Sequence, residues 1–512
     1  MKPLRVVVSI LILTLCSCST IAKKQELEKN KAFEKSFSSF IKKVKDRFDR
    51  KHGLSIAVVK DDQLIFEDYS GYADVDNGMV TDENTSFYIA SSTKSFTALA
   101  ALILDSKGQI DLDRSLASYF PEISFPTELK ADEINLHHLL THTSGIQNWP
   151  IDFSKAYSGT YTDETLVRQL EKYTRAEKKG IGTFKYSNIG YNILSMILKR
   201  ELGKDWKTIV DEKIFKPLKM NQTSANMSEG TRKGWKIAKG HSQFFTDTPK
   251  KLSLQKQDNT MHAAGGIIST ARDLSKWLIV QLNEGKLNGK QVINPVVLKK
   301  SQEQQVVQKR KYMDLKRFGY AYGWNIALTP NKDTLVHHFG GFNGTHAEVS
   351  YIPSKKVGIA IMANDGGIGT DVSFLIASYA LDYFAGRKDL DAYYGKKLDT
   401  AYADILDWKA KREKSKRERA KRKWDLDYKF ADYAGIYENP DFGTLTISYL
   451  GENRLMAAMG NLKTTVYGQP SGRKNMIRFE MRPNSGWNVS FESEKGVIIS
   501  ANMVGMTFNR KK

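Results

Sequence analysis

A basic run from Lys409 to Lys423 divides the chain into two parts with different sequence patterns. The run holds ten Lys or Arg against two Glu, contains no Gly or Pro, and lies between Trp408 and Trp424. These properties are typical of an exposed charged helix. Because 512 residues are more than a single hydrophobic core usually organises, we expect two folded domains joined by a basic helical linker over residues 401–427.

The part before the run combines strand and helix patterns. Leu54 to Lys60 and Gln63 to Asp68 are apolar-rich and separated by a short turn, which predicts a hairpin. A second predicted hairpin, Val349 to Ile352 and Val357 to Ala363, lies near the other end of this part. Strands at both ends with helical segments between them predict an α/β or α+β domain over residues 51–400.

The part after the run has short alternating apolar segments separated by Gly, Asn and Pro. The segments are Thr444 to Tyr449, Leu455 to Met459, Thr464 to Tyr467, Ile477 to Met481, Trp487 to Phe491 and Val497 to Met503. This pattern predicts a small all-β domain over residues 428–512. The segments contain no recognisable catalytic group, so we expect the domain to pack against the first domain or a partner.

The N-terminus has the pattern of a secretion signal. Lys2 and Arg5 precede an apolar run, Val6 to Leu15, which is too short to span a bilayer. The run ends in Leu15-Cys16-Ser17-Cys18, which resembles a bacterial lipobox, with a Leu three residues before Cys18 and a small residue directly before it. We expect residues 1–17 to be a lipoprotein signal peptide and Cys18 to carry the lipid. The alternative is a chance pair of cysteines in an apolar leader.

Export determines which partners are expected. We expect the protein in the periplasm or cell envelope, attached to the membrane through the lipid. If the cell is Gram-negative, we expect the outer membrane, because Ser19 stands where an inner-membrane retention signal has Asp. The net charge of +21 then does not indicate nucleic acid. The basic run either contacts anionic lipid or wall polymer or is a solvated linker, and we favour the linker.

Residues 18–50 predict a tether followed by an amphipathic helix. Apolar side chains recur at helical spacing among many lysines. They are Phe33, Phe37, Ile41, Val44 and Phe48. We expect this helix to serve packing, not function.

One of four Ser-x-x-Lys sequences is a candidate nucleophile motif. They are Ser39 to Lys42, Ser91 to Lys94, Ser253 to Lys256 and Ser471 to Lys474. Only Ser91 begins a segment, continuing to Leu104, that is apolar enough for a helix buried almost all round. One helical turn places the Lys94 amine beside the Ser91 hydroxyl. A desolvated amine loses its proton more readily, so Lys94 can help to deprotonate Ser91.

Three segments resemble, in order, the motifs of the penicillin-recognising serine hydrolases, the family of class C β-lactamases, DD-peptidases, D-aminopeptidases and β-lactamase-like esterases. Phe87 to Thr97 resembles the active-site segment, and Tyr186-Ser187-Asn188 matches the Tyr-x-Asn motif. His338-Phe339-Gly340-Gly341 stands where β-lactamases have Lys-Thr-Gly and is similar to the His-x-Gly form of the esterase and peptidase branches. The similarity spans most of residues 50–380.

The resemblance implies a serine β-lactamase-like fold, an antiparallel sheet flanked by helices, and a role for each matched residue. Ser91 would form the acyl-enzyme, while Lys94 and Tyr186 share the proton transfers, with the pKa of Tyr186 depressed enough for it to act as a base. Asn188 would hold the substrate amide, and His338 would line the opposite wall.

The remaining implied roles concern the oxyanion and the absence of a metal. The oxyanion would lie between the backbone N–H groups of Ser91 and Gly341, where Gly340 and Gly341 allow close approach of the chain. Neither a metal nor another cofactor is required. His142, with the neighbouring His137-His138, could suggest a metal site, but the resemblance treats this segment as scaffold near the cleft.

Three functions are compatible with these motifs. The leading one is hydrolysis of a D-amino-acid peptide, a wall-peptide amide such as one in peptidoglycan, or a carboxylic ester, through a Ser91 acyl-enzyme. The second is a true class C-type β-lactamase, and the third is a catalytically silent binding or scaffold protein. Tyr433 to Ile447 is similar to lipocalin-like domains appended to this family, and we expect residues 428–512 to border the cleft and limit substrate size.

Overall fold

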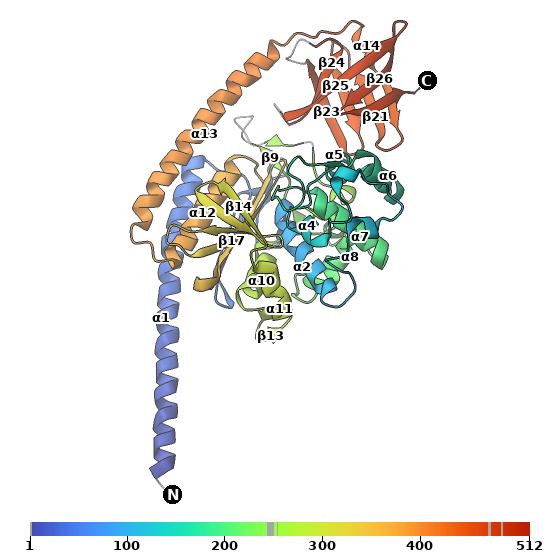
Figure 1. Ribbon diagram of the computed structural model, residues 1–512. Coiled ribbons are helices and arrows are strands. Elements are labelled where there is room, and N and C mark those ends of the chain that lie inside the picture. Colours follow the sequence, from blue (N-terminus) through green and yellow to red (C-terminus); the bar gives the residue numbers. More distant parts are fainter. Residues whose placement is uncertain (1–2, 243–249, 253, 469–472, 483–484, 512) are drawn as a thin grey trace.

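The computed structural model describes residues 3–242, 250–252, 254–468, 473–482 and 485–511 (Figure 1). For residues 3–23 it describes the backbone only, so the predicted lipidation site, the Cys18 side chain, lies outside the described part. Within the described residues, none of the helices is both long enough and apolar enough to cross a membrane.

An eight-stranded antiparallel sheet organises the first domain, with strand order β14-β15-β16-β17-β18-β19-β1-β2. The strands are β1 (Leu54–Lys60), β2 (Gln63–Ser70), β14 (Val306–Tyr312), β15 (Leu315–Tyr320), β16 (Asn325–Leu328), β17 (Thr334–Phe342), β18 (Thr345–Ile352) and β19 (Val357–Ala363). The two predicted hairpins are therefore confirmed. They join through β1 and β19, where Leu54 pairs with Ala363 and Lys60 with Val357.

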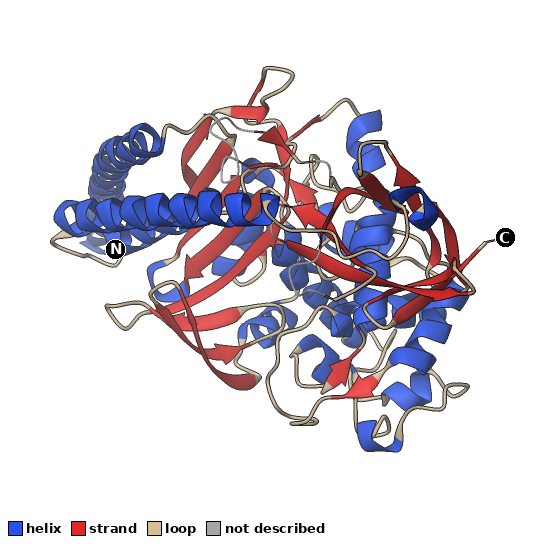
Figure 2. Ribbon diagram, turned by 90° about the horizontal axis from the view of Figure 1, so that it is seen from above, coloured by secondary structure: helices blue, strands red, loops and turns tan. Residues whose placement is uncertain are grey.

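Helices cover both faces of this sheet, as Figure 2 shows. Because side chains alternate along a strand, Ala57 and Val59 of β1 face the core that contains α2 (Thr93–Asp105) and α10 (Ala271–Leu282). Ile56 and Val58 face the opposite core, which contains α1 (Pro3–Phe48), α12 (Ile368–Phe384) and the first half of α13 (Leu390–Ala420). The predicted α/β fold with an antiparallel sheet between helices is confirmed.

Smaller elements complete the first domain between β2 and β14. The helices are α3 (Leu116–Tyr119), α4 (Leu136–Leu140), α5 (Trp149–Phe153), α6 (Asp163–Tyr173), α7 (Ile189–Leu202), α8 (Trp206–Val210), α9 (Met227–Arg232) and α11 (Pro295–Gln302). The short strands are β3 (Tyr72–Asp74), β4 (Met79–Val80), β5 (Thr85–Tyr88), β6 (Ile146–Gln147), β7 (Arg175–Ala176), β8 (Lys236–Ile237), β9 (His241–Ser242), β10 (Lys250–Lys251), β11 (Ile268–Ser269), β12 (Lys286–Leu287) and β13 (Lys290–Gln291).

The N-terminal helix α1 packs its predicted apolar face on α12. Phe37 is fully buried, and the ring of Phe40 stacks on Tyr379 of α12 with the centroids 4.2 Å apart. The helix is continuous from Pro3, so it includes the residues after Cys18 for which we expected a tether.

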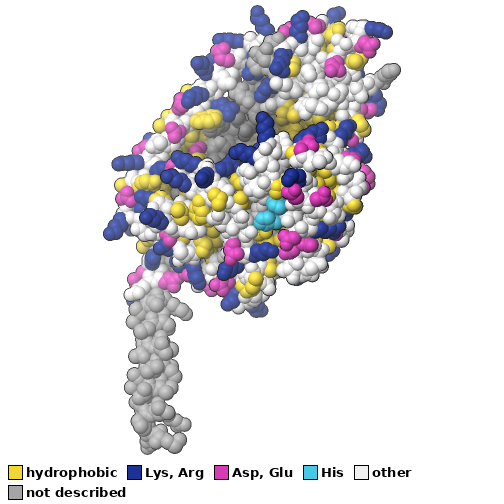
Figure 3. Space-filling model, viewed as in Figure 1, with side chains coloured by type: hydrophobic (Ala, Val, Ile, Leu, Met, Phe, Trp, Pro, Cys, Tyr) yellow, Lys and Arg dark blue, Asp and Glu magenta, His cyan; other side chains and the backbone are white. Residues whose placement is uncertain are grey.

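The basic run begins in the last part of the 31-residue helix α13 and continues to Lys423, three residues past the end of the helix at Ala420. Leu390, Tyr394, Leu398 and Ile405 are buried in the first half of the helix. Trp408, at the start of the basic run, is half exposed. The predicted boundary between the first domain and the linker, at residues 400 and 401, therefore lies inside one continuous helix. On the face shown in Figure 3, Lys and Arg are interspersed with Asp and Glu instead of forming one basic patch.

The C-terminal part is a closed eight-stranded antiparallel barrel. Its strands are β20 (Gly435–Asn439), β21 (Gly443–Tyr449), β22 (Leu455–Met459), β23 (Leu462–Gly468), β24 (Met476–Arg482), β25 (Ser485–Glu494), β26 (Val497–Met503) and β27 (Met506–Arg510), preceded by α14 (Phe430–Tyr433). The six predicted strands are present. The pattern missed β20 and β27, whose pairing closes the barrel.

The barrel packs against α5 and α6 of the first domain (Figure 1). Asp441, in the turn between β20 and β21, is almost fully buried and pairs with Arg168 at 3.1 Å and Lys172 at 3.2 Å. The ring centroid of Trp487 lies 5.0 Å from Phe153 and 5.8 Å from Trp149. The barrel therefore contacts α5 directly, through Trp487.

Candidate active site

Ser91 lies in the turn between β5 and the buried helix α2. The turn is a single 3-10 turn, Ala90–Ser92, and Ala90 has a φ of +45°, an uncommon conformation for a residue with a side chain. Such backbone strain persists only where the surrounding structure enforces it, and it is concentrated at functional sites. Ser91 is half-buried, whereas the next residues enter α2 and are buried.

Lys94 is fully buried beside Ser91, as the spacing predicts. Its Nζ lies 3.3 Å from Ser91 Oγ and donates to Asn188 Oδ1 at 2.7 Å and to the Ala264 carbonyl at 2.8 Å. Burial lowers the pKa of Lys94 to about 7, with Asp152 opposing the shift. A large fraction of this amine is therefore neutral near pH 7 and able to accept the Ser91 proton.

Tyr186 adjoins the same pair. Lys94 Nζ lies 4.8 Å from the centroid of the Tyr186 ring, and the Tyr186 side chain hydrogen-bonds with Ser91. Burial raises the pKa of Tyr186 to about 12, and the hydrogen bond offsets only part of that effect. The expectation of a depressed tyrosine pKa is therefore wrong, because desolvation of the phenolate outweighs the hydrogen bond with Ser91 and the charges of Arg317 and Arg310. Near pH 7 the Tyr186 hydroxyl is therefore protonated, and Lys94 is the group of this pair that can accept a proton.

Asn188 immediately precedes α7. Its side-chain oxygen accepts the Lys94 hydrogen bond. The side-chain NH₂ is then the group of Asn188 available to a substrate carbonyl.

The third motif lies on β17, directly beside the nucleophile. A Cβ at Gly340 would lie 1.9 Å from the Ile89 carbonyl oxygen and 2.9 Å from the Ser91 nitrogen, so only glycine permits this approach. A Cβ at Gly341 would meet no heavy atom within 4 Å. The strand thus brings the segment that contains the proposed oxyanion donor alongside Ser91.

His338 is almost fully buried, with its ring centroid 6.0 Å from that of Tyr186. Its Nδ1 lies 2.7 Å from the Phe339 carbonyl oxygen, which makes Nδ1–H the donor, and its Nε2 has no hydrogen-bond partner among the described residues. Burial, with Lys94 nearby, lowers the pKa of His338 well below its usual value. His338 is therefore a neutral group behind Tyr186 and not a replacement for a cationic lysine.

His142 supports the second motif. It has a φ of +62°, and its Nδ1 accepts from the Ser187 N–H while Nε2 lies 3.0 Å from the Tyr320 hydroxyl. In the neighbouring helix, His137 Nδ1 lies 2.6 Å from the Tyr322 hydroxyl. The described residues include no group of three or more His, Cys, Asp or Glu placed to hold a metal ion.

A cavity of about 240 Å³ adjoins Tyr186. Its wall includes His142, Trp149 and Asp152. Asp152 was not singled out by any sequence motif. Nor was Ala264, whose carbonyl accepts from Lys94.

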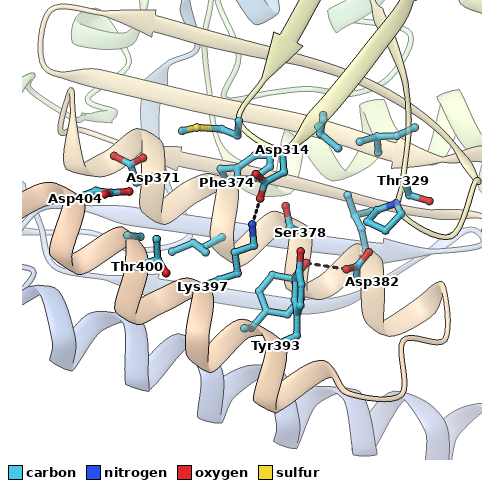
Figure 4. Close-up of a pocket in the computed structure, with 18 residues that line it drawn as sticks. Asp314, Thr329, Asp371, Phe374, Ser378, Asp382, Tyr393, Lys397, Thr400 and Asp404 are labelled. Atoms are coloured by element: carbon cyan, nitrogen blue, oxygen red, sulfur yellow. Dashed lines mark hydrogen bonds and ion pairs between the residues drawn. The ribbon is translucent and has the colours of Figure 1, made fainter.

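A second cavity, of about 290 Å³, lies between the outer strands of the sheet and helices α12 and α13 (Figure 4). Two of its acidic side chains are engaged, Asp314 with Lys397 and Asp382 with the Tyr394 hydroxyl. None of the catalytic candidates lines it.

The fold is that of the serine β-lactamases. A solved class C β-lactamase superposes with a TM-score of 0.55 at 20% identity, over 70% of this chain and 98% of that chain. The penicillin-binding protein homologue from Pyrococcus abyssi, described as octameric, superposes with a TM-score of 0.58 at 22% identity, over 92% and 99%. The D-amino acid amidase from Ochrobactrum anthropi SV3 superposes with a TM-score of 0.54 at 21% identity, over 72% of this chain and 99% of that chain.

The β-lactamase family model matches residues 40–381, and the chain therefore belongs to the β-lactamase family. Among characterised relatives, the unguisins hydrolase of Aspergillus campestris is 25% identical over 447 residues, covering 83% of this chain and 80% of the relative. Protein flp of Staphylococcus aureus MRSA252 is 27% identical over 317 residues, covering 61% and 59%.

Proposed function

We propose that the protein is a serine hydrolase that cleaves an amide or ester through an acyl-enzyme at Ser91. The observation that carries the proposal is the buried Lys94 amine, 3.3 Å from Ser91 Oγ, with a pKa lowered to about 7. A fully buried lysine that keeps three polar partners is costly to maintain for packing alone.

The chemistry follows from the protonation states of the three side chains. Ser91 Oγ attacks the substrate carbonyl carbon and its proton passes to Lys94 Nζ. The neutral Tyr186 hydroxyl donates its proton to the leaving amine or alcohol, and the proton held by Lys94 then returns to Tyr186. Lys94 then takes a proton from a water molecule, which attacks the carbonyl carbon of the acyl-enzyme. The acid leaves, and the proton passes to Ser91 Oγ, which restores the free serine.

The favoured substrates are D-amino-acid peptides, wall-peptide amides and carboxylic esters. The name of one similar protein, a D-amino acid amidase, supports an amide substrate, and that of another, an unguisins hydrolase, supports a hydrolytic reaction. A true β-lactamase is the second candidate, and the neutral, buried His338 speaks against it because the site then lacks the motif lysine that helps to hold the antibiotic carboxylate. The filled catalytic positions speak against a silent scaffold.

We further propose that the protein acts in the bacterial cell envelope, anchored through a lipid on Cys18, with small-molecule or peptide substrates and no nucleic acid partner. The motif at residues 15–18 supports this proposal. Metabolic labelling with a palmitate analogue tests it: label is expected on the wild type and lost in Cys18→Ser. Label that persists in Cys18→Ser contradicts it.

A substrate panel tests the hydrolase proposal. Purified protein and Ser91→Ala are assayed with D-amino-acid peptides, short-chain esters and a cephalosporin. We expect Ser91-dependent turnover of a peptide or ester and slow turnover of the cephalosporin. Rapid cephalosporin hydrolysis favours the β-lactamase, and no Ser91-dependent turnover of any compound favours the scaffold.

A further inference from the structure

Asp152 is the one carboxylate in the wall of the cavity beside Tyr186 for which the described residues show no ion pair. The charged residues in its wall are Asp152, Glu177 and Lys185. Glu177 and Lys185 pair with each other. Asp152 receives a hydrogen bond from Asn192 Nδ2 at 2.7 Å and makes no ion pair within the described residues. No cationic side chain of the described cavity wall therefore pairs with Asp152.

Asp152 lies close to the catalytic lysine. Asn188, which accepts from Lys94, and Asn192, which donates to Asp152, are four residues apart at the start of α7. Residues with this spacing lie on the same side of a helix, with Cβ atoms about 5–6 Å apart. Consistent with this proximity, Lys94 and Asp152 each affect the pKa of the other.

Among the described residues, Lys94 is the cation that acts on Asp152, so a negative charge on Asp152 is balanced when Lys94 is protonated. Catalysis requires neutral Lys94, and a buried carboxylate beside neutral partners is costly. Burial accordingly raises the pKa of Asp152 to about 7. A ligand cation in the cavity would supply the missing positive charge without protonating the base.

We propose that the cavity takes the residue whose carbonyl Ser91 attacks, and that Asp152 pairs with an ammonium group on this residue. The inference rests on the proposed function and narrows its substrate class to amides and esters of amino acids or peptides with a free amine on the acyl side. The ammonium is the α-amino group, which is two bonds from the reacting carbonyl carbon, or a side-chain amine.

Competition with boronic acids tests the inference without requiring a known substrate, because a boronate adds reversibly to an active-site serine. A fluorophosphonate probe reports free Ser91. Three competitors are compared: a 1-aminoalkyl boronic acid, its N-acetyl form, and an N-acetyl form with a side-chain amine. Each is tested on the wild type, on Asp152→Asn, and on Glu177→Gln, a control that changes the other acidic residue of the same cavity.

At least one amine-bearing boronate is expected to protect Ser91 at concentrations about tenfold lower than the uncharged form, a difference of about 1.4 kcal/mol. This preference is expected to disappear in Asp152→Asn and to persist in Glu177→Gln. If the 1-aminoalkyl boronic acid shows the preference, the ammonium is the α-amino group. If the N-acetyl compound with the side-chain amine shows it, the ammonium is on the side chain.

Two results overturn the inference while leaving the proposed function intact: equal protection by all three compounds in the wild type, or equal weakening of all three in Asp152→Asn. The second result makes Asp152 a counter-ion of Lys94 only. Absence of Ser91-dependent probe labelling in the wild type contradicts the proposed function itself and removes the basis of the inference.

Discussion

Lys94 Nζ donates a 2.7 Å hydrogen bond to Asn188 Oδ1, which ties the second motif of the site to the first. The amide oxygen is a neutral acceptor, so it orients the amine without adding a negative charge that would hold the proton on it. The lysine is thus positioned at Ser91 while burial keeps its pKa near 7.

The pH dependence of catalysis should report Lys94. Because its pKa is lowered to about 7 and the neutral amine is the active form, kcat/KM should rise with pH and reach half of its plateau near pH 7. Kinetics between pH 5 and 9 measure this limb. A profile that is flat across this range contradicts the assignment of the base.

Replacing Asn188 with aspartate should shift the rise of kcat/KM with pH to higher pH. A carboxylate in place of the amide oxygen stabilises the charged amine, so the Asn188→Asp variant should raise the pKa of Lys94 by about one unit or more, equivalent to about 1.4 kcal/mol. The rate at pH 7 should fall and recover partly at pH 9. A lower rate with an unmoved limb would instead indicate loss of substrate contact alone.

Gly340 and Gly341 form a matched pair for testing the approach of β17 to the nucleophile. An alanine at 340 collides with Ile89, whereas one at 341 meets open space and retains its backbone N–H. Probe labelling of Ser91 in Gly340→Ala should slow by about 10²-fold or more, the size of effect expected from losing an oxyanion donor. Gly341→Ala should keep most of the wild-type rate. Similar losses in both variants contradict the arrangement described for β17.

Phe37 tests the contribution of α1 to stability. The side chain is fully buried, and its ring centroid lies 4.9 Å from those of Phe33 and Phe66. Phe37→Ala should lower the free energy of unfolding by about 3–5 kcal/mol. Leu27→Ala, on an exposed part of the same helix, should change it by less than about 0.5 kcal/mol. Urea unfolding compares the two, and equal values would show that α1 does not pack as described.

Trp487 tests whether the barrel limits substrate size. It packs on Trp149, which lines the cavity beside Tyr186. Trp487→Ala should leave labelling by a small fluorophosphonate unchanged and increase the rate with a bulky one. Ile499→Ala, exposed on the barrel, is the control. An unchanged size preference, also after deletion of residues 428–512, contradicts the proposed role of the barrel.

The elements that sequence patterns predict here are those specified by local spacing. The hairpin of β1 and β2, the buried helix after Ser91 and six barrel strands follow from period and turn residues alone. The closing strands β20 and β27 were missed because their pairing joins the two ends of the barrel. The extent of α13 was also missed, because its first half is held by packing on α12 and not by its charge pattern.

Site residues divide in the same way. Ser91, Lys94, Tyr186 and Asn188 lie in recognisable motifs, and the fold brings them together. Asp152 reaches the site through tertiary packing of α5, so no sequence spacing could indicate it. The direction of the Tyr186 pKa shift depends on how deeply the phenol is buried, which motifs do not encode.

The most direct test of the account is to map where a fluorophosphonate probe attaches. The wild type, Ser91→Ala and Ser39→Ala are treated with the probe, digested and analysed by mass spectrometry; Ser39 is the exposed serine of another Ser-x-x-Lys sequence. We predict one adduct, on the peptide containing Ser91, that is absent in Ser91→Ala and unchanged in Ser39→Ala. An adduct that persists in Ser91→Ala, or none in the wild type, would contradict the assignment of Ser91 as the nucleophile.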